Sequence, residues 1–439
     1  MRNSISERIK RLRFVILSLL LVLVFSVANA GAEECVEVID EEGDSEMVCS
    51  PTKQPQPDET PQAQPPPSPQ AQPSPPPQGL LEPLEVSFAG FTFLGDFNEK
   101  EKLYPFSSTL KPDVLNAALF EAIKRVNNPN IKLITENLAN LDKGQTLSLA
   151  FGVSDEKTRI QRFRGKFLVA YEIYAQILVF DFERDAMKII AVYPVRMQFT
   201  DMLDEEPTYE HSIAVFRKIY LDTGFKLNIF KLWVDRLNSA SLKESYGNFL
   251  KVTDIDIPPE TWAFVRDDQK GGFPMQVAKL LESSLSANQQ VPVVPFADDA
   301  SMGAMRATFS NGKVYRLKLP EPDFGISLKI RPFRKFVVEK PAYKQVVYGS
   351  YVTIKLRHID LNKTYLDASF RHIPMATIDK TARVELNDWD EFQKSLQGLL
   401  DPLTKQISEQ DSDWLKNATR TENVEEQFNK VLKIIKSCR

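Results

Sequence analysis

The chain has 439 residues, and its 55 Lys and Arg against 59 Asp and Glu give a net charge of −4. This mildly acidic balance, without a basic tail or stripe, argues against nucleic acid as the main partner. The length is sufficient for two hydrophobic cores, at about 100 to 200 residues per domain.

The first 30 residues have the parts of a signal for export. Five basic residues precede an apolar run over residues 14–27, and Val27-Ala28-Asn29-Ala30 places small residues where a signal peptidase cleaves. We predict cleavage after Ala30, which leaves a periplasmic or secreted protein with a net charge of −8. A retained inner-membrane anchor is the alternative, although an apolar run of about 14 to 17 residues is short for one. Cys35 does not directly follow the apolar run, which argues against a lipid anchor.

Residues 31–50 form an acidic segment bounded by two cysteines. Cys35 and Cys49 enclose six acidic residues, and the alternation around Glu42-Gly43-Asp44 predicts a small hairpin. In an oxidising compartment, a disulfide between Cys35 and Cys49 would contribute about 3 kcal/mol. The acids lack the EF-hand spacing, so no metal site is predicted. We expect Cys438 to be a free thiol, with pairing between two chains as the alternative.

Residues 51–83 are predicted to be a disordered linker, because proline alternates there with Gln, Ser, Ala and Thr. Such a composition cannot form a core and favours an extended polyproline helix. About 28 residues at roughly 3.1 Å each would span on the order of 90 Å. The segment is interpreted as a spacer across an envelope layer, and a passive linker and a docking site for a proline-binding module are the alternatives.

From residue 84 the pattern predicts an α+β fold with two similar domains, at residues 84–250 and 251–410, and a carboxyl-terminal helix in residues 411–439. Each domain is expected to hold a mixed or antiparallel sheet, with a long β-hairpin, packed by helices. The elements expected in the first domain are a strand at 86–94, a helix at 112–126, a strand at 131–134, a hairpin of 168–182 with 187–199, and helices at 210–221 and 227–242. Those expected in the second are a strand at 261–265, a helix at 274–287, a strand at 291–296, two strands within 304–330, a hairpin of 345–360 with 365–378, and a helix at 388–407.

The repeated order of elements suggests a diverged internal duplication. Tyr171, Tyr174 and Ile177 align with Tyr348, Tyr351 and Ile354 on the two expected hairpins. Because any two hairpins share some residues, a true duplication and a merely shared element order both stay open.

This order resembles the small α/β domain of the TolB amino-terminal and CsgG-type envelope proteins. The residues that carry the resemblance are the segment 348–354, the return strand at 365–378 and their counterparts in the first half. The resemblance implies an envelope scaffold or a secretion channel, and no enzymatic activity. CsgG-type proteins are lipid-anchored, so the absence of a lipidation cysteine here departs from that family.

The sequence contains no nucleophile elbow, phosphate-binding loop or Cys-x-x-Cys motif. His358 and His372 are expected on neighbouring strands but not opposite each other, and His211 is expected in the first turn of a helix. We therefore predict no catalytic residue, cofactor or metal. A pair of carboxylates for glycoside hydrolysis cannot be identified from sequence, and the nearest candidates are Asp254 with Asp256 and Asp298 with Asp299.

Two basic stretches interleave arginine with phenylalanine, and each precedes or enters an expected strand. They are either contacts for an anionic partner, such as phospholipid headgroups or a wall polymer, or the charged edge strands that prevent pairing with other chains. The residues concerned are Arg159, Arg162, Arg164, Lys166, Arg331, Arg334 and Lys335.

The sequence thus predicts a non-catalytic exported envelope protein, a binding or scaffold module held on a proline-rich stalk. Its expected partner is an envelope protein or a cell-wall component, and a second copy of the chain stays open. The membrane would be contacted only through an uncleaved amino-terminal anchor. The alternatives are a secreted carboxylate-dependent hydrolase of an envelope glycan and an oligomeric outer-membrane secretion component.

Overall fold

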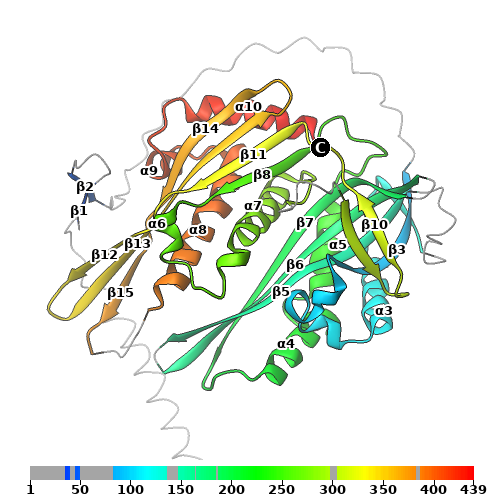
Figure 1. Cartoon of the computed structure of the whole chain (residues 1–439), viewed down its shortest axis with the longest axis horizontal. Coiled ribbons are helices and arrows are strands. Elements are labelled where there is room, and N and C mark those ends of the chain that lie inside the picture. Colours follow the sequence, from blue (N-terminus) through cyan, green and yellow to red (C-terminus); the bar gives the residue numbers. More distant parts are fainter. Residues whose placement is uncertain are drawn as a thin grey trace, which may run out of the picture. The chain divides into compact units, whose positions relative to one another are not determined.

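The computed structural model describes residues 35–39, 45–49, 83–135, 147–163, 165–183, 186–296, 304–381 and 386–439. Two compact units divide the chain, Met1–Gln78 and Gly79–Arg439. The predicted α+β class is confirmed by two large sheets with helices packed against them (Figure 1). The expected signal segment and the linker lie outside the described residues.

In the first unit the predicted hairpin is confirmed. Strands β1 (Cys35–Ile39) and β2 (Ser45–Cys49) pair antiparallel, with Cys35 directly opposite Cys49. This register is the one that a disulfide between the two cysteines requires, and the bond itself stays a prediction.

The first sheet of the second unit closes on itself. Its strand order is β4-β3-β5-β6-β7-β10-β9, and β9 also pairs with β3, so that six of the described strands form a ring. The strands are β3 (Leu84–Leu94), β4 (Ile131–Ile134), β5 (Ser148–Phe163), β6 (Lys166–Glu183), β7 (Ala186–Leu203), β9 (Ala304–Phe309) and β10 (Val314–Lys318). Apolar side chains such as Leu178, Phe180 and Phe309 fill one face of the sheet at the closed end.

The other face of the first sheet is covered by helices α3 (Pro112–Ile123), α4 (Tyr209–Leu221) and α5 (Ile229–Ser239). Helix α4 begins at Thr208, whose side chain accepts a hydrogen bond from the backbone N–H of His211, as expected for a helix start. Aromatic side chains of the sheet and α5, including Phe151 and Trp233, are fully buried between them. We call this sheet with its helices the first lobe.

A buried carboxylate anchors β5 to the helical layer. Glu156 accepts hydrogen bonds from the backbone N–H groups of Phe106 (3.0 Å) and Ser107 (2.9 Å) and from the Tyr220 hydroxyl (2.7 Å). Burial raises the pKa of Glu156, and these hydrogen bonds act against that rise. The second half of β5 is thereby fixed in place.

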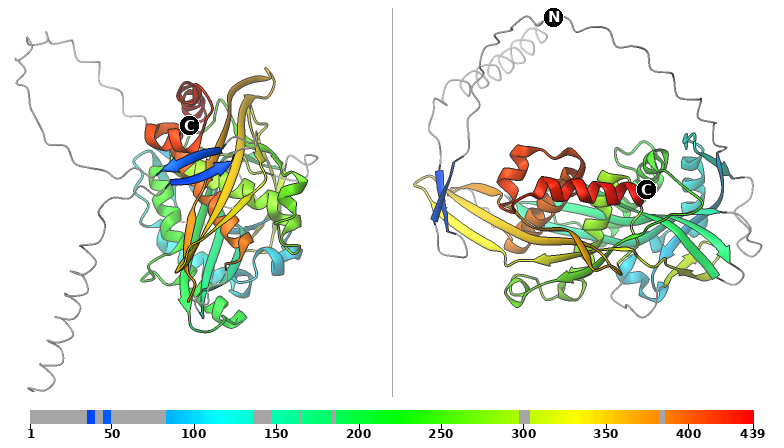
Figure 2. Two further views of the ribbon diagram at one scale, coloured as in Figure 1. Left: turned by 90° about the vertical axis from the view of Figure 1, so that its left-hand side faces the viewer. Right: turned by 90° about the horizontal axis from the view of Figure 1, so that it is seen from above.

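The second lobe is built around β13 (Tyr343–His358). One half of β13 lies in a sheet with β8 (Leu250–Asp256), β11 (Phe324–Ile330) and β14 (Lys363–His372). Its other half pairs with β12 (Arg334–Glu339) and β15 (Met375–Asp379). The helices of this lobe are α6 (Pro259–Trp262), α7 (Phe273–Gln289), α8 (Asp388–Glu409), α9 (Ser412–Ala418) and α10 (Val424–Ser437). Figure 2 shows α10 lying along the strands of this sheet, where it packs on β14.

The two lobes share an order of strand pairing. In the first, β3 runs parallel to β4 and β5, and β5, β6 and β7 follow antiparallel. In the second, β8 runs parallel to β11 and makes a parallel bridge at Val294, and β11, β13 and β14 follow antiparallel. The shared element order is therefore present in the backbone, while common ancestry of the halves stays a prediction.

Two expected strands of the second half are wrong. Residues 259–262 form the helical turn α6, because Pro259 at its first position suits a helix start. Residues 291–296 do not form a strand, because neighbouring residues bond to different sheets: Val293 N–H donates to Val192 O and Val294 N–H to Leu250 O, both at 2.8 Å. The first strand of the second lobe is instead β8, where no strand was expected.

Two further differences concern the first sheet. Strand β5 was not expected, although it is 16 residues long. The region 304–330 holds three strands, and β9 and β10 pair with β3 and β7 of the first sheet, beyond the expected boundary at residue 250.

Candidate functional site

Helix α7 lies between the two sheets and contacts β7, β8 and α8 (Figure 1). Residues 280–286 of α7 are all buried, and the buried residues of this helix include polar ones such as Glu282, Ser284 and Gln289. Polar groups can be buried only where partners exist, so the surrounding elements must supply them.

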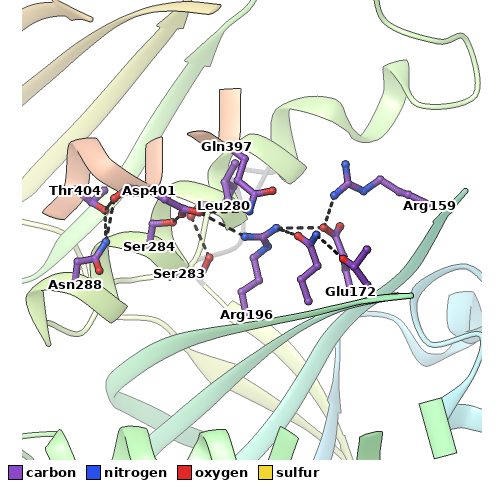
Figure 3. A network of polar contacts seen from close by, with 12 residues as sticks. Arg159, Glu172, Arg196, Leu280, Ser283, Ser284, Asn288, Gln397, Asp401 and Thr404 are labelled. Carbon is purple, nitrogen blue, oxygen red and sulfur yellow. Dashed lines mark hydrogen bonds and ion pairs between the residues drawn. The ribbon is translucent and has the colours of Figure 1, made fainter. Parts of the chain in front are cut away.

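An ion-pair network joins the first sheet to α8, and its Asp401 accepts a hydrogen bond from Ser284 of α7 (Figure 3). Glu172, 1% exposed, accepts from Arg159 at 2.6 Å and from Arg196 at 3.2 Å. Arg159 also donates to Gln393 of α8 at 3.2 Å, and Arg196 lies 4.0 Å from Asp401. Because the charges are desolvated, the network fixes a geometry more than it adds stability.

Other polar contacts extend this junction on both sides. Lys279 of α7 pairs with Asp155 of β5 at 3.2 Å, and burial lowers the pKa of Lys279. Asn288 of α7 donates to Thr404 of α8 at 2.8 Å. Gln161 of β5 donates to Glu391 of α8 at 2.8 Å. The strands and helices that border the site described next are thus held together by polar contacts, two of which involve a charged group.

Beside β5 lies a groove of about 480 Å³. Its lining residues are Thr158, Arg159, Ile160, Arg162, Phe167, Glu206, Arg266, Gln269 and Asp390. Strand β3 pairs with β5 only as far as Val153, and residues 155–163 pair with β6 alone among the described strands. Since successive side chains of a strand point to opposite faces, a lining that includes residues 158, 159 and 160 places the groove along the free edge of β5.

The opposite wall of the groove comes from the start of α8 and the segment before α7. Gln269 Oε1 accepts hydrogen bonds from Trp389 Nε1 at 2.7 Å and from Gln393 Nε2 at 3.2 Å. These bonds fix the orientation of the Gln269 side-chain amide. Its Nε2 group is then a hydrogen-bond donor at this wall of the groove. Arg266 is exposed and forms an ion pair with Asp268 at 2.5 Å.

Asp390 is the unusual member of this wall. It is 8% exposed, and its Oδ2 is buried without a hydrogen-bond partner among the described residues. Burial raises the pKa of Asp390, while Arg159, Arg266 and Lys394 act in the opposite direction. Its position in the first turn of α8 also favours the charged carboxylate. The groove thus holds a buried acceptor that needs a donor.

Only part of the predicted basic set reaches the groove. Arg159 lines it from within the ion network, and Arg162 lines it with its guanidinium 5.4 Å from the Phe167 ring centroid. Lys166 instead pairs with Asp204 at 2.7 Å outside the groove. Arg164 lies outside the described residues.

The second basic stretch lies elsewhere, at the junction of β11 and β12. Arg331 lies over the Tyr351 ring at 5.8 Å, and Lys335 pairs with Asp388 at 2.7 Å. Arg334 is exposed at the start of β12. None of the three lines the groove, so the structure does not unite the two basic stretches in one site.

The expected carboxylate candidates do not form a pair at this groove. Asp254 and Asp256 are exposed on β8, where Asp256 lies 3.4 Å from Lys329, and residues 298 and 299 are outside the described part. Sequence analysis missed Arg266, Gln269, Asp390 and Glu206, which have no common motif. In the described ranges no group of three or more His, Cys, Asp or Glu could hold a metal ion.

No described helix is long and apolar enough to cross a membrane. Cys438 is a buried free cysteine, as expected for the unpaired thiol.

No family model matches the chain, and no curated protein matches it. Similar solved structures include protein XCC0632 of Xanthomonas campestris, from the family DUF330 (10% identity, TM-score 0.22, 40% of this chain and 94% of that one). Others are a minor lipoprotein of Acinetobacter baumannii (12%, 0.20, 39% and 96%) and a putative neuraminyllactose-binding hemagglutinin homolog of Helicobacter pylori (11%, 0.23, 44% and 95%).

Likenesses with TM-scores this low carry no argument about function. None of these three neighbours is a TolB or CsgG protein, and the resemblance to those two families stays a prediction.

Proposed function

We propose that the chain is a non-catalytic exported envelope protein whose folded unit binds a partner through the groove beside β5. The observation that carries this proposal is the groove itself, where a buried carboxylate oxygen of Asp390, without a hydrogen-bond partner among the described residues, lies beside arginine side chains at the edge of β5. Unpaired polar groups in a buried wall favour a ligand that pairs with them. The expected signal segment and proline-rich linker support the envelope as the place of binding.

Site-specific photocrosslinking in intact cells tests this proposal. A benzoylphenylalanine at Ile160, which is 38% exposed in the groove, is compared with one at Val314, which is 62% exposed on β10. We expect a crosslinked envelope component from position 160 that is absent from position 314. Equal labelling from both positions, or none from position 160, would show that the groove is not the binding site.

A secreted hydrolase remains the second candidate, because Glu206 and Asp390 both line the groove and burial raises the pKa of Asp390. A carboxyl with a raised pKa can act as a general acid beside a second carboxylate. Digestion of purified envelope glycan by the full chain, abolished in both Asp390→Asn and Glu206→Gln, would replace the binding proposal with this one. The oligomeric secretion component rests on the family resemblance alone and stays a prediction.

A further inference from the structure

The free edge of β5 differs from an ordinary exposed strand edge. Residues 155–163 pair with β6 on one side, and on the other side no described strand pairs with them. A free edge presents a row of N–H and C=O groups that can pair with another strand. From residue 158 to residue 162 this row spans about 13 Å, at roughly 3.3 Å per residue.

The second lobe provides a comparison. By the shared pairing order, β12 flanks β13 as the second half of β5 flanks β6. Five of the six residues of β12 are exposed, with Phe336 and Val337 at 41% and 48%. Basic residues at such an edge, Arg334 and Lys335, suit the protection of an edge from pairing. The edge of β5 instead faces a wall formed by Arg266, Gln269 and Asp390.

The groups at this wall define the chemistry of an occupant. Arg159, Arg162 and Arg266 offer donors to anionic groups, and Gln269 offers an amide N–H. Asp390 requires a donor, which a backbone N–H can supply. An extended peptide carries both kinds of group, since its backbone donates and accepts while acidic side chains meet the guanidinium groups.

We propose that the groove binds an extended acidic peptide segment of a partner protein, as a strand added along the free edge of β5. The inference rests on the proposed function and names the class of ligand at the same site. Strand addition of this kind obtains affinity from main-chain hydrogen bonds and specificity from alternate side chains. An anionic glycan would satisfy the arginines but would leave the row of backbone groups on β5 without partners.

The test uses an end-blocked heptapeptide of alternating Glu and Thr, measured by fluorescence anisotropy with the full mature chain. Two further peptides carry N-methyl groups on the odd or on the even residues. An added strand uses the N–H of every second residue for pairing, so one methylated peptide should lose affinity by at least about tenfold and the other should bind as the parent does.

Charge variants make the measurement specific to the groove. Arg162→Glu should weaken binding of the parent peptide by at least about tenfold. Lys166→Glu reverses a charge on the same hairpin outside the groove, where its exposed ion pair contributes little, and should leave binding within about twofold. Circular dichroism of each variant checks that the fold is retained.

Three outcomes would overturn the inference: a parent peptide that does not bind below about 1 mM, equal binding of both methylated peptides, or displacement by an anionic oligosaccharide with no effect of methylation. Each of these outcomes can occur while the groove still binds an envelope partner, so it can be told apart from failure of the proposed function. If crosslinking from position 160 still captures an envelope glycan or lipid, the groove binds a partner but the ligand class is wrong.

Discussion

Glu282 offers a quantitative test of the packing around α7. Its side chain is 2% exposed, and one oxygen accepts a hydrogen bond from the backbone N–H of Phe296 at 2.6 Å. Burial raises the pKa of Glu282 to about 8, while the Phe296 hydrogen bond, Lys279 and Lys251 act in the opposite direction. The ordinary value is 4.5, so ionisation in the folded state costs about 4 to 5 kcal/mol more than in the unfolded chain.

The sign of the pH dependence follows from this difference. The folded protein binds the Glu282 proton more tightly than the unfolded chain does. The contribution of this proton to the free energy of unfolding is therefore fully present below pH 4.5 and is lost as the pH rises towards 8. Within this window the free energy of unfolding falls by at most about 1.4 kcal/mol per pH unit from this group alone. Glu282→Gln keeps an acceptor for Phe296 and stays neutral, which removes this contribution.

Urea unfolding of the wild type and of Glu282→Gln at pH 5, 6, 7 and 8 measures the effect. We expect the free energy of unfolding of the variant to gain about 3 kcal/mol relative to the wild type between pH 5 and pH 8. Glu121→Gln, at an exposed position of α3, controls for the loss of a carboxylate and should track the wild type within about 0.5 kcal/mol. Parallel stability curves for the wild type and Glu282→Gln would refute the assignment of a buried, neutral Glu282.

Three further predictions concern other parts of the chain. Glu172→Gln leaves two buried arginines without their carboxylate, so its free energy of unfolding should fall by about 3 kcal/mol in urea, and an unchanged value would contradict the buried network. Gly152→Ala places a methyl group 2.6 to 2.8 Å from a leucine side chain of β3 and should cost about 1 to 3 kcal/mol in thermal unfolding, whereas Gly247→Ala, with open space around it, should cost little. Mature protein from an oxidising compartment should resist alkylation at Cys35 and Cys49 until it is reduced, as mass spectrometry would show, and alkylation without reduction would exclude the disulfide.

Much of the fold was predictable where one periodicity dominates. The long hairpin of β6 and β7 consists of apolar and β-branched residues around a charged turn, and α8 repeats apolar residues at helical spacing. Both were expected close to their observed bounds.

Strand β5 shows why other elements were missed. Its second half carries Asp155, Glu156, Lys157, Arg159 and Arg162, a pattern typical of a solvated surface. In the fold Asp155 and Glu156 are buried, and their partners, like those of Arg159, lie far away in the sequence: Lys279 for Asp155, Tyr220 for Glu156 and Gln393 for Arg159. A single sequence contains no signal for such pairings.

The groove was unpredictable for the same reason. Its two walls come from residues 158–162, residues 266–269 and residue 390, which are brought together only by tertiary packing. Sequence analysis identified Arg159 and Arg162 from their basic context but could not indicate Asp390, whose importance depends on a missing hydrogen-bond partner. A helix was expected at residues 388–407, but nothing in the sequence singled out Asp390 within it.

The ring closure of the first sheet has a consequence for how the protein is made. Strands β9 and β10 are synthesised only after β8 and α7 of the second lobe, and they close the gap between β3 and β7. Until residue 318 has left the ribosome or the translocation channel, β3 and β7 each present an unpaired edge. We therefore expect a chain that ends at residue 250 to be prone to aggregation, because both of these edges would stay exposed.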